Sequence, residues 1–375
     1  MARERWDAIV VGAGAMGTAT AWHLARRGRA VLLLERSTIG HDRGSSHGPT
    51  RIFRLSYHHP DYVRMARRAL EEWRALEAAA GERLLHRTGG LEAGPGARRN
   101  ADALAAAGAP SGWLGAPEVE ERWPGIRVPD GAEVLFQPDA GVVLADRTVR
   151  AQARAATALG ASLVEDSTVV SVEPGNGQVA VRTARGDEHR APVAVVTAGA
   201  WAGPLVASAG VSLPLRVTQE QVHYVLEGVG GPVPSLIEWT DPPDAPAYLV
   251  PDPHAPGVVK VAEHLARAET TADSRSFRID PARRARTLEF ARRWLRQPGD
   301  ERGAETCLYT NTPDEDFVLD RIGPLVIGSP CSGHGFKFTP LIGSVLADLA
   351  TSASPPREVP LERFSVGRFH ASTLR

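Results

Sequence analysis

The sequence predicts an α/β fold built on a parallel β-sheet, and two observations predict it. "AIVVGAGAMG" places the pattern G-x-G-x-x-G directly after a short run of apolar, mostly β-branched residues. Two further strand–glycine–helix patterns, "VAVVTAGAWAGPL" and "PLVIGSPCSGHGFKFTPLIGSVLADLA", follow much later in the chain. These three pieces predict one Rossmann-type dinucleotide-binding domain, with other segments of the chain inserted between them.

The N-terminal stretch has the element order of a dinucleotide-binding βαβ unit. It predicts a buried strand over 8–11, a glycine turn of Gly12, Gly14 and Gly17, a helix over 18–27 stopped by Gly28, a strand over 31–34, and then Glu35. The glycines allow a tight turn and close approach of a pyrophosphate, which the helix N-terminus attracts. Glu35 is placed to accept hydrogen bonds from a ribose diol, and its charge disfavours the 2′-phosphate of NADP.

The two later patterns bear on the choice between NAD and FAD. A second strand–loop–helix, distant in sequence, favours one long cofactor held at two places, which suits FAD better than NAD. Ahead of both later patterns, residues 145–166 predict a helix followed by a strand. The helix is expected to turn Val149, Ala153, Ala156 and Leu159 to the core.

Composition bounds the remaining possibilities. The 375 residues favour two domains, and the formal net charge of −1 gives no general attraction to nucleic acid or anionic membranes. The apolar run near the start is too short for a secretory core or a membrane span, so we expect a cytoplasmic location. The two cysteines cannot form a disulfide framework and have no zinc-ligand spacing, so no metal is expected.

Lysine is nearly absent from the sequence. Of 43 lysines and arginines, only Lys260 and Lys337 are lysines. Two ammonium groups that survive such a bias mark places where the broad, planar guanidinium cannot serve. The alternating strand "VVKVAEH" is expected to turn Lys260, Ala262 and His264 to one face, and Val261 and Glu263 to the other.

Several separated motifs resemble one known family. "VVGAGAMG", "GSSHGPTRIFR", "ERWPGI", "TAGAW", "VVKVAEH", "CLYTNTPDEDFVLD" and "SGHGFKF" together resemble the monomeric sarcosine oxidase and N-methyltryptophan oxidase group, within the D-amino-acid-oxidase-like flavoproteins. The resemblance implies FAD-dependent oxidation of the C–N bond of an N-methyl or other secondary, including cyclic, amino acid. It further implies hydride transfer to flavin N5, reduction of O2 to hydrogen peroxide, and a monomer.

The resemblance also implies an interleaved architecture. An FAD-binding domain is expected from 1–86, 141–210 and 315–375. A substrate domain, built on an antiparallel or mixed β-sheet, is expected from 87–140 and 211–314.

Cofactor-binding residues follow from the same motifs. They are Gly12, Gly14, Met16, Gly17, Glu35, Arg36, Ser45, His47, Thr50, Gly199, Trp201, Gly333, Gly335, Phe336 and Lys337, with Cys307 as the covalent anchor of the flavin. His47 has a backbone role as open to it as a side-chain role. A thiolate can add to the electron-poor ring, whereas a free cysteine is more often a small buried hydrophobe. Cys331 is expected to pack in the core near the flavin.

The resemblance assigns the chemistry to a small set of side chains. Arg54 and Lys337 would bind the substrate carboxylate, and Tyr309 and Tyr248 would line the substrate pocket. Arg51 would lie close to the flavin, and Lys260 would stabilise the anion that forms as O2 is reduced. His264 is open between a catalytic and a structural role, since a lone histidine is more often structural.

Two alternatives stay open. The chain could be an FAD dehydrogenase or a biosynthetic oxidase that acts on a cyclic imino acid such as pipecolate or a proline-like acid, or on a carrier-linked amino acid. A flavin-binding protein without turnover is the alternative from another class.

Overall fold

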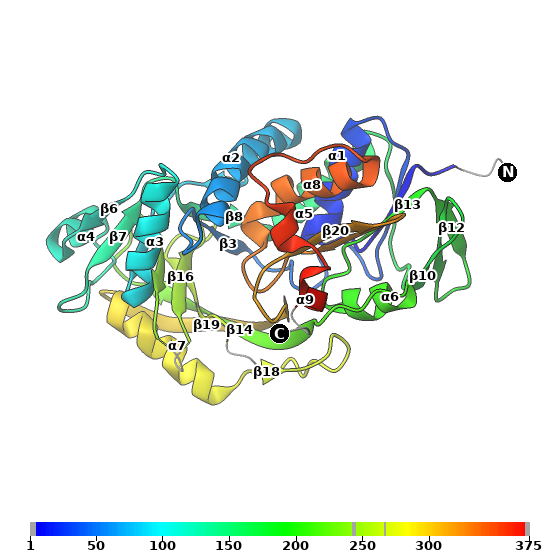
Figure 1. Cartoon of the computed structure of the whole chain (residues 1–375). Coiled ribbons are helices and arrows are strands. Elements are labelled where there is room, and N and C mark those ends of the chain that lie inside the picture. The colour runs from blue at the N-terminus through cyan, green and yellow to red at the C-terminus, as the bar shows by residue number, and fades with distance from the viewer. Residues whose placement is uncertain (1–4, 242–244, 266–267, 372–375) are drawn as a thin grey trace.

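The structure is a computed structural model that describes residues 5–241, 245–265 and 268–371. Two β-sheets organise it, and helices cover the outer side of each (Figure 1). The first sheet lies with the helices α1, α5 and α8, and the second contains the long strands β14 and β19 below them. No helix in the described residues is long and apolar enough to cross a membrane.

The first sheet is almost entirely parallel. Within the described residues its strand order is β20-β21-β13-β1-β2-β9, and only β20 runs antiparallel, in a hairpin with β21. The bounds are β1 (Ala8–Val11), β2 (Val31–Leu34), β9 (Ser162–Val164), β13 (Val193–Val196), β20 (Val318–Ile322) and β21 (Leu325–Ser329). Neighbouring strands thus come from three distant parts of the chain, as the interleaved glycine patterns predict.

Both faces of this sheet are covered, which explains why its strands read as continuous apolar runs. The helices α1 (Ala15–Arg26), α2 (Pro60–Ala80), α5 (Ala145–Ala158) and α8 (Thr339–Thr351) cover one face. Val10 and Leu33 join that core, whereas Ile9 and Leu32 point the opposite way. There they meet α6 (Ala202–Ser208) and a small sheet of β10 (Val169–Pro174), β11 (Val179–Thr183) and β12 (Glu188–Ala191).

The second sheet is mixed, because β5 and β15 pair in parallel while its other pairs are antiparallel. Its order in the described chain is β18-β14-β17-β16-β15-β5-β7-β6, with β19 also paired to β14. The bounds are β5 (Gly90–Ala93), β6 (Gly112–Leu114), β7 (Val134–Gln137), β14 (Arg216–Glu227), β15 (Ser235–Glu238), β16 (Ala247–Pro251), β17 (Val258–Glu263), β18 (Ala268–Glu269) and β19 (Pro298–Asn311).

Helix α7 (Pro281–Trp294) covers one face of the second sheet, together with α4 (Ala116–Arg122). Trp294 and Val261 pack in the core between them, and Glu263 pairs with Arg283 and Arg286 of α7. The predicted alternation of β17 is therefore confirmed, and it leaves the opposite face of the strand, with Lys260, for the interior of the molecule.

Short elements join the two sheets. A small sheet of β3 (Thr50–Phe53), β4 (Leu85–His86) and β8 (Gly141–Leu144) lies between them, and α3 (Pro95–Ala106) packs beside α2. The remaining pieces are η1 (Gly199–Trp201), η2 (Phe336–Phe338), η3 (Leu361–Phe364) and α9 (Arg368–Ala371).

The α/β fold class with its parallel sheet is confirmed, and the strands over 8–11 and 31–34 match the prediction. Two local predictions were wrong. The first helix begins at Ala15, because Gly14 already serves as its N-cap. Leu159 is exposed because it is the C-cap residue of α5, one position past the last helical turn. The domain boundaries stay a prediction.

Candidate active site

A cavity of about 500 Å³ opens where the carboxyl ends of the parallel strands face the second sheet. Residues directly after β1, β2, β13 and β21 line one wall, and β14 to β17 with β19 supply the other. Ligands of open parallel sheets bind at this edge. Of the residues predicted for the site, only Gly17 and Thr50 do not line the cavity. Those that do are Gly12, Gly14, Met16, Glu35, Arg36, Ser45, His47, Arg51, Arg54, Gly199, Trp201, Tyr248, Lys260, His264, Cys307, Tyr309, Gly333, Gly335, Phe336 and Lys337.

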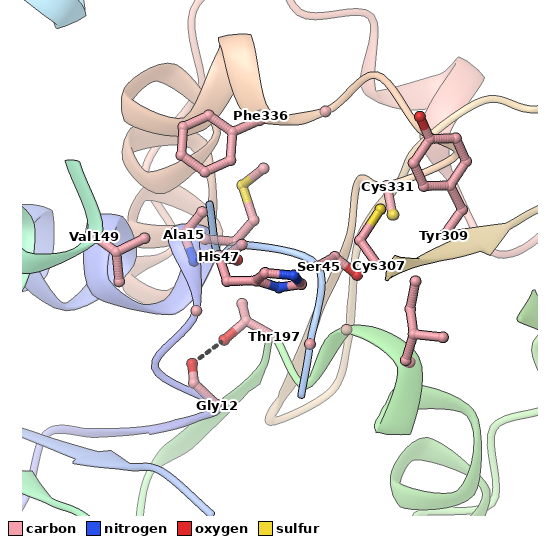
Figure 2. A pocket seen from close by; sticks show the side chains of 18 of the residues that line it. Gly12, Ala15, Ser45, His47, Val149, Thr197, Cys307, Tyr309, Cys331 and Phe336 are labelled. Atoms are coloured by element: carbon pink, nitrogen blue, oxygen red, sulfur yellow. Dashed lines mark hydrogen bonds between the residues drawn. The ribbon is translucent and has the colours of Figure 1, made fainter. Parts of the chain in front are cut away.

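The glycine turn after β1 leaves no room for side chains. Gly12 has φ +96°, and a Cβ there would lie 2.8 Å from the carbonyl oxygen of Thr197. The Thr197 hydroxyl also donates to the Gly12 carbonyl oxygen at 3.0 Å (Figure 2). A Cβ on Gly17 would collide with that same carbonyl, so Gly17 acts through helix–strand packing and not by lining the cavity.

Glu35 is fixed at the end of β2. Its carboxylate accepts hydrogen bonds from the N–H of Ala13 at 2.7 Å and of Ser37 at 2.9 Å, and His41 lies 3.3 Å away. Burial alone would raise the pKa of Glu35, but the hydrogen bonds from His41, Ser37 and Ala13 outweigh it and lower the pKa. A charged acceptor is therefore fixed directly after β2, where the βαβ pattern predicts a contact to a ribose.

The residues present fit a long dinucleotide. The hydroxyl of Ser45 and Nδ1 of His47 are buried with no hydrogen-bond partner anywhere in the described residues, and both residues line the cavity (Figure 2). The other nitrogen of His47 meets the carbonyl oxygen of Thr306 at 3.1 Å. Buried polar atoms are seldom left unpaired. The Ser45 hydroxyl and the His47 nitrogen are therefore polar groups left for a cofactor.

Arg51 is held by the loop that precedes it. Its guanidinium donates to the carbonyl oxygens of Ser45 at 3.0 Å, His47 at 2.7 Å and Thr50 at 2.8 Å. The ammonium of Lys260 donates to the same carbonyl of Thr50. Burial first, and then the charge of Arg51, lower the pKa of Lys260 well below its ordinary value. Thr50 thus contributes its backbone, and two cations share one acceptor.

Arg54 and Lys337 meet at Tyr57. The guanidinium carbon of Arg54 lies 4.1 Å from the centre of the Tyr57 ring, and Lys337 Nζ donates to the Tyr57 hydroxyl at 2.8 Å. Lys337 also donates to the carbonyl oxygen of His334 at 2.6 Å. Burial and the nearby Arg54 lower the pKa of Lys337 well below its ordinary value. Two buried cations therefore lie side by side without a carboxylate partner in the described residues.

A second group of side chains lines the cavity beside these cations. His264 Nδ1 lies 3.3 Å from the Tyr309 hydroxyl, and a Cβ on Gly333 would collide with both rings. Burial, Arg54 and Lys337 lower the pKa of His264 to about 3, so the imidazole is neutral near pH 7. Tyr248, in β16, also lines the cavity.

The two cysteines lie on the same side of the cavity, next to Tyr309 (Figure 2). Both are free thiols. Burial raises the pKa of Cys307 to about 11, although Arg51 and Lys260 oppose the shift. Cys331 is engaged by the backbone N–H of Thr310 at 3.3 Å.

Sequence reasoning missed a buried carboxylate behind the cation pair. Glu92 accepts hydrogen bonds from Asn100 at 2.7 Å, from the indole of Trp239 at 2.9 Å and from the hydroxyl of Ser56. Arg54 in turn donates to the carbonyl oxygen of Ser56 and lies 5.2 Å from the Trp239 ring. No local pattern marks Glu92, because these three partners come from separate segments of the chain.

A parallel sheet with a glycine turn, a fixed acid after β2 and a long cavity at the strand ends defines a dinucleotide-dependent enzyme of the α/β class. The family pattern described as "FAD dependent oxidoreductase" matches residues 7–349, and the chain belongs to that family. In the part of the chain that the structure describes, no group of three potential ligands could hold a metal ion.

Curated relatives agree over nearly the full length. The chain is 33% identical to a peroxisomal sarcosine oxidase of Homo sapiens, covering 98% of this chain and 97% of that protein. It is 30% identical to a monomeric sarcosine oxidase of Bacillus sp. (strain NS-129), covering 97% of each. Among solved structures, the open form of NikD, an unusual amino acid oxidase essential for nikkomycin biosynthesis, superposes with a TM-score of 0.86. The two are 28% identical, over 96% of this chain and 97% of NikD. The resemblance seen in the sequence motifs is therefore confirmed.

Proposed function

We propose that the protein oxidises the C–N bond of an N-methyl or other secondary amino acid, cyclic ones included, and passes the electrons to O2. The observation that carries the proposal is the meeting of Arg54 and Lys337 at Tyr57. Two buried cations without a carboxylate partner in the described chain are costly, and a carboxylated ligand compensates them.

The substrate carboxylate binds between Arg54 and Lys337. Arg54 offers a planar fork and Lys337 a compact ammonium, so together they fix both oxygens by charge-assisted hydrogen bonds. Tyr57 holds the two cations in register, since it stacks on one and accepts from the other. Binding at this point orients the rest of the substrate along the cavity toward His264 and Tyr309.

The amine reacts in its neutral form. Arg54 and Lys337 disfavour a third positive charge nearby, and so they lower the pKa of a bound ammonium. His264 is itself neutral, because its pKa is about 3, and can accept a hydrogen bond without adding charge. Tyr309 and Tyr248 close this side of the pocket.

Bound FAD would accept a hydride from the carbon next to the amine nitrogen, leaving an imine, and would pass the two electrons to O2, which takes up two protons to become hydrogen peroxide. Lys260 stabilises the negative charge that develops on oxygen. Its ammonium is buried, pairs with no carboxylate among the residues that the structure describes, and is fixed by the Thr50 carbonyl, so it needs little reorganisation. The cation pair for the substrate and the cation for oxygen are thus separate groups, on separate elements.

Cys307 is the proposed covalent anchor. Its thiol lines the cavity, and Arg51 and Lys260 would favour the thiolate that must form before a bond to the cofactor. Cys331 has no such role, since its sulfur accepts from the Thr310 backbone.

The test is a peroxide-coupled screen of the purified yellow protein with N-methyl and cyclic amino acids. Peroxide from at least one class, and none from the matching amines that lack a carboxylate, is the expected result. Flavin that is bleached by an amine but not reoxidised by air would identify a dehydrogenase instead. Flavin that no amine bleaches would identify a binding protein without turnover.

A further inference from the structure

A segment between β18 and α7 crosses to the dinucleotide end of the cavity. In Figure 1 this stretch of chain runs from the second sheet toward the side where α6 lies. Asp273 lines the cavity beside Arg36 and Trp201. Its carboxylate accepts a hydrogen bond from the Trp201 indole at 2.9 Å and lies 3.3 Å from Nη2 of Arg36. Because the Arg36 guanidinium also stacks 4.2 Å from the Trp201 ring, each of the three groups holds the other two.

Two residues further on, Arg275 lies beneath the loop that carries Ser45 and His47. Its side chain donates to the carbonyl oxygen of Asp42 at 2.8 Å, and the guanidinium stacks 3.8 Å from the ring of Phe277. Arg275 is 6% exposed, and its Nε and Nη1 have no partner among the described residues. Burying a guanidinium with two unpaired N–H donors lowers the stability of the fold. The contacts of Arg275 within the described chain do not compensate this cost.

The segment is a formed turn and not a loose connection. Thr271 and Ser274 exchange hydrogen bonds between each side-chain oxygen and the other backbone N–H, both at 3.1 Å. The Ser276 N–H donates to the side chain of Gln219, in β14, at 3.0 Å. Phe277 takes the strained φ of +58° that aims its ring at Arg275. The turn therefore reaches the cavity with a fixed shape.

We propose that residues 271–277 form a clasp that helps to retain FAD through noncovalent contacts. Asp273 and Arg275 are its positioning residues. Asp273 contacts both members of the stacked Arg36–Trp201 pair in the cavity wall, and Arg275 donates to Asp42 at the start of the 42–47 loop. This proposal depends on membership of the FAD dependent oxidoreductase family and does not depend on the identity of the substrate.

The place of the clasp predicts which part of the cofactor it holds. Arg36 directly follows Glu35, the acid at the ribose position. Asp273 therefore closes over the adenosine half of FAD, which FMN lacks. Loss of the Asp273 contacts should weaken the binding of FAD and leave the binding of FMN unchanged.

The test measures cofactor affinity in the full chain. A Cys307→Ser background makes the flavin exchangeable, and dissociation constants for FAD and FMN are obtained by equilibrium dialysis of the flavin-free protein. Asp273→Ala and Arg275→Gln are each expected to raise the FAD dissociation constant about fivefold to tenfold, from one or two lost hydrogen bonds. Asp273→Asn keeps the acceptor for Trp201 and should lie between parent and Asp273→Ala.

Arg278→Gln is the matched control, since Arg278 lies just beyond the clasp and is exposed. It should leave both constants within twofold of the parent. The proposal is overturned if Asp273→Ala also stays within twofold for FAD, or if it weakens FMN as much as FAD. Asp273 is 71% exposed, so its replacement leaves the fold intact and decides the question even if Arg275→Gln does not fold.

Discussion

Arg51 and Lys260 donate to one acceptor, the backbone carbonyl oxygen of Thr50. The two residues come from different sheets, β3 and β17, so this carbonyl joins the sheets at the cavity. Burial and Arg51 both weaken the hold of Lys260 on its proton. A fixed ammonium with a lowered pKa is suited to stabilise charge that appears only during a reaction.

Replacement of Lys337 by methionine should weaken substrate binding, because it removes a contact to the substrate carboxylate and no other contact to the substrate. We expect the dissociation constant of sarcosine to rise at least about 30-fold, as for removal of one member of a buried charged contact. The constant comes from the amine dependence of anaerobic flavin reduction. Dimethylamine, which lacks the carboxylate, serves as the control probe. An equal loss for both amines would contradict the assignment.

Cys307→Ser should release the flavin on acid precipitation, whereas the parent protein should keep its yellow colour in the pellet. Cys331→Ser is the matched control, because Cys331 lines the same cavity and should leave the attachment intact. A pellet that is colourless in the parent would show that the attachment does not form.

Glu92→Gln should lower the pKa of Lys337 and spare that of Lys260. Burial and Arg54 already lower the pKa of Lys337, and the charge of Glu92 opposes them. With two lysines in the chain, ¹⁵N-lysine labelling gives two side-chain signals, which Lys337→Met assigns. In Glu92→Gln, Lys337 should lose its proton at a lower pH than in the parent. The protein should therefore also lose its affinity for carboxylates at a lower pH than the parent. A Lys337 signal that titrates as in the parent would mean that Glu92 acts only as packing.

His264 should make the protein less stable in acid. Its folded pKa of about 3 lies below the ordinary 6.5, so between these values the unfolded chain binds a proton that the folded chain refuses. The free energy of unfolding therefore falls as pH drops through this window. His264→Gln should reduce the slope by about 1.4 kcal/mol per pH unit. Urea titrations between pH 4 and 6 measure it, and an unchanged slope would place the imidazole in solvent.

Local signals in the sequence were enough to predict the parallel sheet. A β-branched run, the glycines and the acid Glu35 lie within one short stretch, and the βαβ order leaves few alternatives. Helix ends were predicted less well, since Gly14 is both turn and N-cap, and Leu159 continues the helical pattern past the real end of α5.

Contacts between distant segments could not be read in this way. Glu92 and Arg275 are ordinary charged residues in sequence, and only the folded chain shows that they are buried next to cavity-lining residues. The two lysines were found because the composition makes them rare, which is a signal independent of fold.

The separation of the two lysines is the central claim, and double-mixing stopped flow tests it most directly. Flavin is first reduced anaerobically by a carboxylated amine and then mixed with O2, in the parent, Lys260→Met and Lys337→Met. Lys260→Met should lower the rate of flavin reoxidation at least about 100-fold and change the rate of reduction little. Lys337→Met should slow flavin reduction and change the rate of reoxidation little. Reoxidation of Lys260→Met at the rate of the parent would contradict the account.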